Sequence, residues 1–228
     1  MAGQTTNAAG FAPSAAIARS LVIYGVIAGA FYLTLSILLG INRDGFDFTT
    51  HPLSLLMLGE DGHWQRANFY LTGLMVIAAA IGILRAMRLS GHRKKAAWPL
   101  LVYGLCLLAS GTFPPDGVEG FPPGADATGV SLFGTLHLAF GAIGYLALAL
   151  SAWLMSQWLA DRKQPQLQRF SRISTYVIIL GFLLGAALAQ FPIGVLALWV
   201  TVVTGWAWLA TISLFVYRNL PHPDPKRR

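Results

Sequence analysis

The chain has 228 residues, of which 55% are hydrophobic and 11% charged, and its formal net charge is +7. Because soluble domains carry about 25% charged residues, this composition excludes an ordinary soluble protein and favours a polytopic membrane protein. The positive charge does not indicate nucleic acid binding, since the basic residues cluster at the ends of apolar stretches, where anionic lipids attract them. The single cysteine, Cys106, excludes an intrachain disulfide and a CxxC motif.

Residues 1–19 lack the basic start of a secretory signal, and we expect a disordered cytoplasmic tail there. A membrane span needs about 20 mostly apolar residues. Within residues 20–217, six stretches are suitable: Ser20–Gly40, Asn68–Leu89, Ala96–Phe113, Val130–Leu159, Ser174–Gln190 and Pro192–Tyr217. Residues 218–228 form a basic cytoplasmic tail. The predicted fold is therefore all-α, a bundle of six transmembrane helices.

The charged residues predict how the chain crosses the membrane. Every basic residue except Arg43 and Arg66 lies before the first stretch, around the second or fourth connection, or in the last tail. Every acidic residue except Asp161 and Asp224 lies in the first or third connection. Because positively charged loops stay in the cytoplasm, we expect both termini there and the first and third connections outside. We expect the protein in the plasma (inner) membrane, with lipid as its main partner.

Small and aromatic residues in the apolar stretches suggest how the helices meet. Gly181 and Gly185 are four residues apart and permit close approach of the fifth helix to a neighbour. Glycines of the fourth stretch, Gly141 among them, are expected to do the same. Trp199 and Trp206 are seven residues apart and share one face of the sixth helix. That face is either a packing surface or the wall of a ligand site.

The first connection, residues 42–68, is the longest polar interruption and contains its own helix signals. Thr50 or His51 can cap a short helix that has Pro52 at its first position and ends at Gly59. The residues between are apolar, and they predict a re-entrant or interfacial helix of about two turns. Backbone at membrane depth is tolerated only when it packs on protein or lines a wet cavity.

Polar residues are predicted to gather near the outer surface. His137 lies inside the fourth stretch, about 10 Å below that surface. Ionisable groups in a span usually face the bundle interior or a cavity. A re-entrant His51 reaches the same depth, and Asp116 ends the third stretch on the same side. Arg43 and Asp44 lie nearby, so these five residues form the candidate site.

Four interpretations of this candidate site remain open. His51, Asp116 and His137 can bind Zn²⁺ with an open water position for hydrolysis, or a histidine and the aspartate can act as general acid and base without metal. Arg43 and the histidines can instead hold an anionic headgroup. In the structural interpretation, His137 makes one interhelical hydrogen bond and His51 caps the short helix. Haem is not expected, because only His137 lies securely inside a span.

Two groups of residues resemble the signatures of a known family. The first comprises Arg43–Gly45, His51–Leu56, Gly59, Trp64–Phe69 and Gly73; the second comprises Gly111–Asp116 and Leu136–His137. Together they resemble the multi-helix membrane family catalogued as domain of unknown function 998, over nearly the whole chain. The resemblance implies a six-helix bacterial or archaeal membrane protein, and it implies no substrate.

We therefore expect an integral membrane protein that binds a lipid headgroup or small ligand in an outward-facing polar pocket. The ligand-binding residues are then Arg43, Asp44, His51, Asp116 and His137. One alternative is an intramembrane metal-dependent hydrolase that uses His51, Asp116 and His137. Another is a structural or accessory membrane subunit, for which we expect no cavity. Whether the protein is an enzyme stays open on this evidence.

Overall fold

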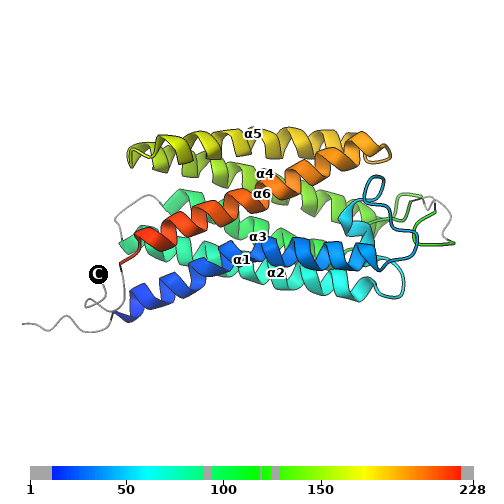
Figure 1. Ribbon diagram of the computed structural model, residues 1–228, viewed down its shortest axis with the longest axis horizontal. Coiled ribbons are helices and arrows are strands. Elements are labelled where there is room, and N and C mark those ends of the chain that lie inside the picture. The colour runs from blue at the N-terminus through cyan, green and yellow to red at the C-terminus, as the bar shows by residue number, and fades with distance from the viewer. Residues whose placement is uncertain (1–11, 90–93, 119, 125–128, 222–228) are drawn as a thin grey trace, which may run out of the picture.

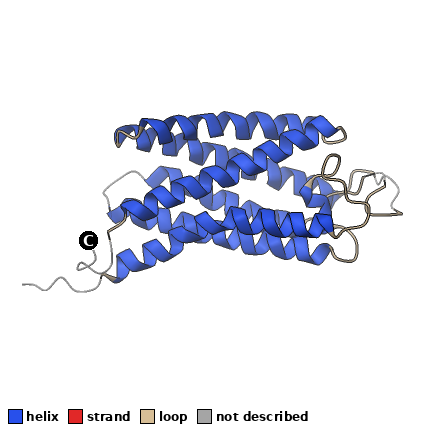
Figure 2. Cartoon of the chain, in the orientation of Figure 1, coloured by secondary structure: helices blue, strands red, loops and turns tan. Residues whose placement is uncertain are grey.

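The computed structural model describes residues 12–89, 94–118, 120–124 and 129–221. Consecutive α-helices run in opposite directions through this part of the chain (Figure 1). They are α1 (Pro13–Ile41), α2 (Gly62–Leu89), α3 (Ala97–Thr112), α4 (Leu132–Asp161), α5 (Pro165–Ala187) and α6 (Pro192–Asn219), with short 3₁₀ helices η1 (Leu53–Met57) and η2 (Lys94–Ala96). The described residues contain no β-strand (Figure 2), so the all-α prediction is confirmed.

Helix length and surface composition indicate a membrane protein. Within the described residues, α1, α2, α4, α5 and α6 are long and apolar enough to cross a membrane. The apolar α3 has 16 residues, or about 24 Å, against a hydrocarbon core of about 30 Å. Large apolar side chains such as Leu38, Leu105 and Leu180 are more than half exposed on the bundle surface. Because such a surface is unfavourable in water, it supports a multi-pass membrane protein.

The six helices form a closed ring in chain order. Each packs against the helices before and after it, and α6 packs back against α1. Arg19 of α1 donates hydrogen bonds to the carbonyl oxygens of Tyr217 and Leu220, at 3.0 and 2.9 Å. The start of α1 and the end of α6 therefore lie together, at what we call the terminal end (Figure 1). The opposite, loop end carries residues 42–61, 188–191 and the described part of 113–131.

Glycines allow close approach between α5 and α6, as the sequence predicts. A Cβ atom on Gly181 would meet the hydroxyl of Thr201, and one on Gly185 would lie 2.5 Å from Cγ of Leu198. Real Cβ atoms do not approach other atoms this closely. A larger side chain at either position would push the two helices apart. The predicted role of this glycine pair is therefore confirmed.

Three helices begin earlier than the apolar stretches predict: α2 begins at Gly62 instead of Asn68, and the other two begin at a proline. α1 begins at Pro13 and α5 at Pro165. Each proline occupies the first turn, where its missing N–H group would have had no helical partner. Both first turns contain small or polar residues, so an apolar stretch does not reveal them. Residues 13–19, predicted as part of a disordered tail, are helical, and residues 1–11 lie outside the described part.

A buried polar network joins α1 to the first turns of α2. The side chains of Ser36, Gln65, Asn68 and Thr72 are fully buried. Ser36 Oγ accepts hydrogen bonds from Gln65 Nε2 at 2.9 Å and from Asn68 Nδ2 at 3.0 Å. Asn68 Nδ2 also donates to the carbonyl oxygen of Tyr32, and Asn68 Oδ1 accepts from Thr72. Because interhelical hydrogen bonds stabilise helix pairs in lipid, this network fixes α1 against α2.

We predict that Asn68→Ala lowers the free energy of unfolding by about 1–3 kcal/mol, because it leaves buried groups of the network without partners. Unfolding in detergent measures the loss. Asn219→Ala is the matched control, since Asn219 is exposed and donates to the carbonyl oxygen of Phe215 in its own helix. Equal losses in the two variants would contradict a stabilising role of the network.

Candidate functional site

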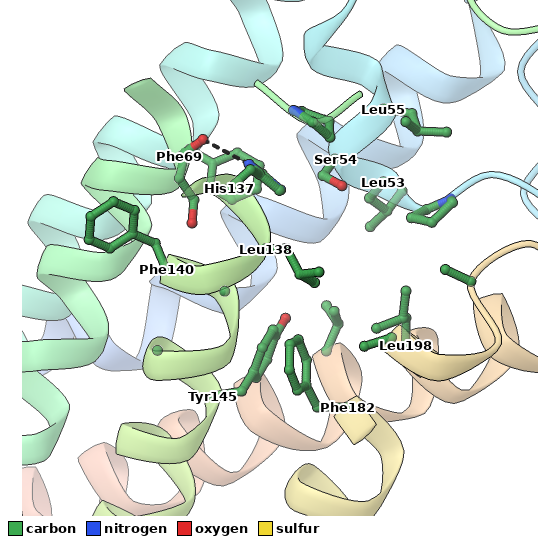
Figure 3. Close-up of a pocket in the computed structure, with 18 of the residues that line it drawn as sticks. Leu53, Ser54, Leu55, Phe69, His137, Leu138, Phe140, Tyr145, Phe182 and Leu198 are labelled. Carbon is green, nitrogen blue, oxygen red and sulfur yellow. Dashed lines mark hydrogen bonds between the residues drawn. The ribbon is translucent and has the colours of Figure 1, made fainter. Parts of the chain in front are cut away.

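The helix ring surrounds a half-open cavity of about 550 Å³ toward the loop end. All six α-helices and η1 contribute residues to its wall (Figure 3). Cavities of about 300–1,000 Å³ are typical of small-molecule sites. The cavity is therefore the candidate functional site.

The deep part of the cavity is aromatic. Tyr32 of α1 and Tyr103 of α3 both pack against Trp206 of α6, with ring centroids 5.4 and 5.9 Å apart. Tyr145 of α4 lies 6.0 Å from Tyr103 and 5.1 Å from Phe182 of α5. Figure 3 shows Tyr145 and Phe182 side by side at the cavity. Aromatic side chains from five helices thus meet at one level of the ring.

The tryptophan pair and Gly141 form walls of the cavity. Trp199 and Trp206 both line it, and Trp206 also packs against Tyr32 and Tyr103, so this α6 face is both a packing surface and a cavity wall. Trp199 Nε1 also donates to the carbonyl oxygen of Phe48 at 3.1 Å, which holds the first connection over the ring. A Cβ atom on Gly141 would meet only Phe182, at 3.9 Å. Gly141 therefore leaves room for the cavity instead of forming the predicted close helix contact.

His137 joins α4 to the end of α3 and also lines the cavity. Its Nδ1 lies 3.1 Å from the carbonyl oxygen of Ser110 and 2.8 Å from that of Phe113. These oxygens belong to the last turn of α3, where carbonyl groups lack helical partners. Because a carbonyl oxygen only accepts, Nδ1 is the donor, and the neutral ring presents Nε2 as an acceptor. The interhelical bond of the structural interpretation is therefore present.

Asp116 binds the start of α4 and lines the cavity near its loop end. Its carboxylate accepts hydrogen bonds from the backbone N–H of Ser131, at 3.0 Å, and from the Ser131 hydroxyl. The Ser131 hydroxyl in turn accepts from the N–H of Gly134 at 3.0 Å. A negative charge is favourable at this position because the N-terminus of a helix carries partial positive charge.

Within the described lining, the cavity brings together two of the five predicted site residues, Asp116 and His137. Arg43, Asp44 and His51 lie outside the wall. The described part of the chain contains no group of three His, Cys, Asp or Glu residues arranged to hold a metal ion. This structure therefore assembles neither the predicted zinc ligands nor the predicted headgroup site of Arg43 with the histidines.

His51 belongs to the loop cover, by which we mean residues 42–61 and the described part of 113–124. Its Nδ1 accepts from the backbone N–H of Asp47 at 3.0 Å, and its ring packs on Phe46 and Phe121. No side chain caps η1, which has Pro52 at its N-cap. The predicted cap by Thr50 or His51 is wrong, and η1 is a five-residue 3₁₀ helix, shorter than expected.

Arg43 connects the two ends of segment 42–61, next to the start of α2. Its Nη2 donates to the carbonyl oxygen of Leu58 at 2.6 Å, and its Nη1 lies 3.5 Å from Asp61 Oδ2. The guanidinium group also lies over the ring of Phe121. Gly59 has a positive φ of 74°, and its missing Cβ atom would overlap the Arg43 side chain. These contacts give Arg43 an anchoring role in the cover.

The model of the protein family of unknown function DUF998 matches residues 26–214, which is most of the chain. The chain belongs to this family. The match confirms the resemblance seen in the sequence and includes both Asp116 and His137. No curated protein and no solved structure gives a match.

The predicted site did not include the tyrosines of the deep cavity. Tyr32, Tyr103 and Tyr145 lie inside long apolar runs, where their rings resemble other core side chains. Their hydroxyl groups were the available signal, because polar groups in a span usually face the bundle interior or a cavity. Their convergence from three helices depends on the closed ring, which no local pattern reveals.

We predict that Gly59→Ala loosens the loop cover more than Gly120→Ala does. Both glycines have positive φ, of 74° and 80°, so both variants carry a similar backbone cost of about 1–2 kcal/mol. Only at Gly59 does the new methyl group displace Arg43, since no atom lies within 4 Å of a Cβ at Gly120. Hydrogen exchange of residues 43–61 should rise more in Gly59→Ala. Equal exchange in both variants would show that Arg43 does not anchor the loop cover.

We also predict that acidification loosens the loop cover through His51. Burial lowers the pKa of His51, and the nearby Asp47 carboxylate offsets part of this effect. His51 in an unfolded cover therefore takes up its proton near pH 6.5, the pKa of a free imidazole, where His51 in the folded cover is still neutral. The stability from neutral His51 is present above this pH and is lost as pH falls toward the lowered pKa.

Hydrogen exchange of residues 43–58, corrected for intrinsic rates, measures this effect of pH. Exchange should rise on acidification from neutral pH in the wild type. It should rise less in His51→Asn, which keeps an acceptor for the Asp47 N–H but does not titrate. An identical response of the two proteins would show that His51 is not the responsible group.

Proposed function

We propose that this protein crosses the membrane six times and binds a small membrane-soluble molecule in the cavity inside its helix ring. The observation that carries this proposal is the cavity of about 550 Å³, whose wall receives residues from every α-helix. Because every helix contributes, the cavity is a product of the ring architecture and not a local surface irregularity. The family match is consistent with a membrane protein and assigns no activity.

The six-span topology rests on the position of α3. It packs between α2 and α4 and runs in the direction opposite to both. Since α2 ends at the terminal end and α4 begins at the loop end, α3 covers the distance between them, with η2 adding length at its start. Arg19, Arg85, Arg162 and Arg218 lie toward the terminal end. By the positive-inside rule, we assign that end to the cytoplasm of a plasma (inner) membrane.

The cavity wall indicates the kind of ligand. Most lining residues are apolar or aromatic, and the described lining includes no lysine or arginine. Asp116 and His137 provide polar groups toward the loop end, and the aromatic residues lie deeper. We infer an amphiphilic ligand whose polar group lies near these two residues. Its site is more apolar than the predicted pocket, because the polar residues of 42–61 form the cover instead.

The two alternatives have less support. The hydrolase requires His51 beside Asp116 and His137, but the ring of His51 packs on Phe46 and Phe121 in the loop cover. The accessory-subunit interpretation predicts that there is no cavity, and the helix ring surrounds one. Ligand binding is therefore the function that the geometry supports best.

We predict that Gly141→Leu depletes the bound molecule. The nearest atom to a new Cβ is 3.9 Å away, so the leucine side chain extends into the cavity without displacing the backbone. The matched control is Ala139→Leu, because Ala139 is exposed on α4 and does not line the cavity. Mass spectrometry of compounds extracted from the purified proteins should show a species in the wild type and control that is depleted in Gly141→Leu. Identical extracts from all three would contradict the proposal.

A further inference from the structure

We propose that the molecule in the cavity is an uncharged, membrane-soluble alcohol or phenol that donates a hydrogen bond from its hydroxyl group to Nε2 of His137. This inference rests on the proposed function and narrows it to a chemical class. It separates such a molecule from anionic phospholipids and from pure hydrocarbons. Three features of the cavity support it: the hydrogen bonding of His137, the charge of the wall and the hydroxyl groups of the deep cavity.

The hydrogen bonds of His137 leave one acceptor for a ligand. Nδ1 donates to the carbonyl oxygens of Ser110 and Phe113, so the proton of the neutral ring is on that nitrogen. Nε2 has no partner within the described part of the chain. It is not fully buried, so part of its surface is accessible. Because His137 lines the cavity, this nitrogen is accessible to a ligand there. A lone pair selects a molecule with an O–H or N–H donor.

The charge of the wall disfavours an anion. Asp116 is the one carboxylate in the described lining, and that lining includes no lysine or arginine. Arg43, in the nearby cover, is already paired with Asp61 and the Leu58 carbonyl oxygen. An anionic headgroup would lose part of its hydration and face the charge of Asp116. A hydroxyl group avoids both costs.

The deep cavity disfavours a pure hydrocarbon. The hydroxyl groups of Tyr103 and Tyr145 have no hydrogen-bond partner within the described residues. Neither hydroxyl group is fully buried, so both keep some accessible surface. Along α4, Tyr145 lies about 12 Å beyond His137. A molecule without polar atoms would leave these hydroxyl groups and Nε2 unsatisfied, which costs free energy in an apolar site. A polar group on the ligand is therefore needed at one level at least.

The test compares three probes that share one tail: dodecanol, its methyl ether and dodecyl phosphate. Each is titrated into the protein in lipid nanodiscs, as a version with a brominated tail that quenches tryptophan fluorescence, because Trp199 and Trp206 line the cavity. Since one hydrogen bond is worth about 0.5–1.5 kcal/mol, the alcohol should bind about two- to twelvefold more tightly than the ether. The phosphate should bind more weakly than the alcohol.

His137→Asn isolates the acceptor. The Asn side-chain nitrogen takes a position close to that of Nδ1, so it can still donate to Ser110 and Phe113, but nothing replaces the lone pair of Nε2. In this variant the alcohol and the ether should bind about equally, with the affinity for the ether unchanged. Gly141→Leu should reduce quenching by all three probes, and the quenching that remains measures partitioning into the nanodisc lipid.

The outcomes distinguish this inference from the proposed function. Equal binding of alcohol and ether to the wild type, or tightest binding of the phosphate, would overturn the inference and leave a ligand-binding cavity. Quenching that Gly141→Leu does not reduce, for all three probes, would overturn the proposed function itself. If His137→Asn does not fold, the ratio of alcohol to ether affinity in the wild type decides the inference alone.

Discussion

The close contact between α1 and α6 turns a row of six helices into a ring. At this contact, Gly25 lies against Ser213 and Gly29 against Trp206. A Cβ atom on Gly29 would lie 2.5 Å from that of Trp206, so only glycine permits this approach. Lipid provides little hydrophobic driving force between helices, and small residues that allow close packing are therefore important. The same contact places the Trp206 ring against Tyr32, which forms part of the cavity wall.

The two ends of the ring are packed differently. Toward the terminal end, Leu148, Met155, Leu159, Trp208 and Ile212 are fully or almost fully buried and fill the interior. Toward the loop end, glycine replaces such side chains on α4, and the interior opens into the cavity. The loop cover, which includes η1, lies over this opening. The cavity therefore lies toward one end of the bundle.

His137 illustrates why structural and functional interpretations of one residue need not exclude each other. Nδ1 satisfies the last carbonyl groups of α3, a task that any well-placed donor performs. That bond also fixes the orientation of the imidazole ring and the identity of its acceptor nitrogen. The structural bond thereby leaves the second nitrogen as the acceptor that we propose for a ligand.

The sequence predicts the helices well because hydropathy and length determine them locally. It also predicts the glycine contact of Gly181 and Gly185, which depends on spacing alone. The site was harder to predict, because it depends on contacts between distant segments. From its position in the sequence, His51 is predicted to lie near the cavity. In the structure, its hydrogen bond to the Asp47 N–H holds it in the loop cover instead. Likewise, the convergence of the tyrosines follows only from ring closure.

The single cysteine of the chain provides the most direct measurement of the cavity. Cys106 of α3 is 7% exposed and lines the cavity. The folded protein and its Gly141→Leu variant would be treated with a small neutral methanethiosulfonate, and their intact masses followed with time. We expect one adduct on the folded wild type and a markedly slower reaction in the Gly141→Leu variant. An adduct that forms only after unfolding, or equal rates in the two proteins, would contradict an accessible cavity inside the ring.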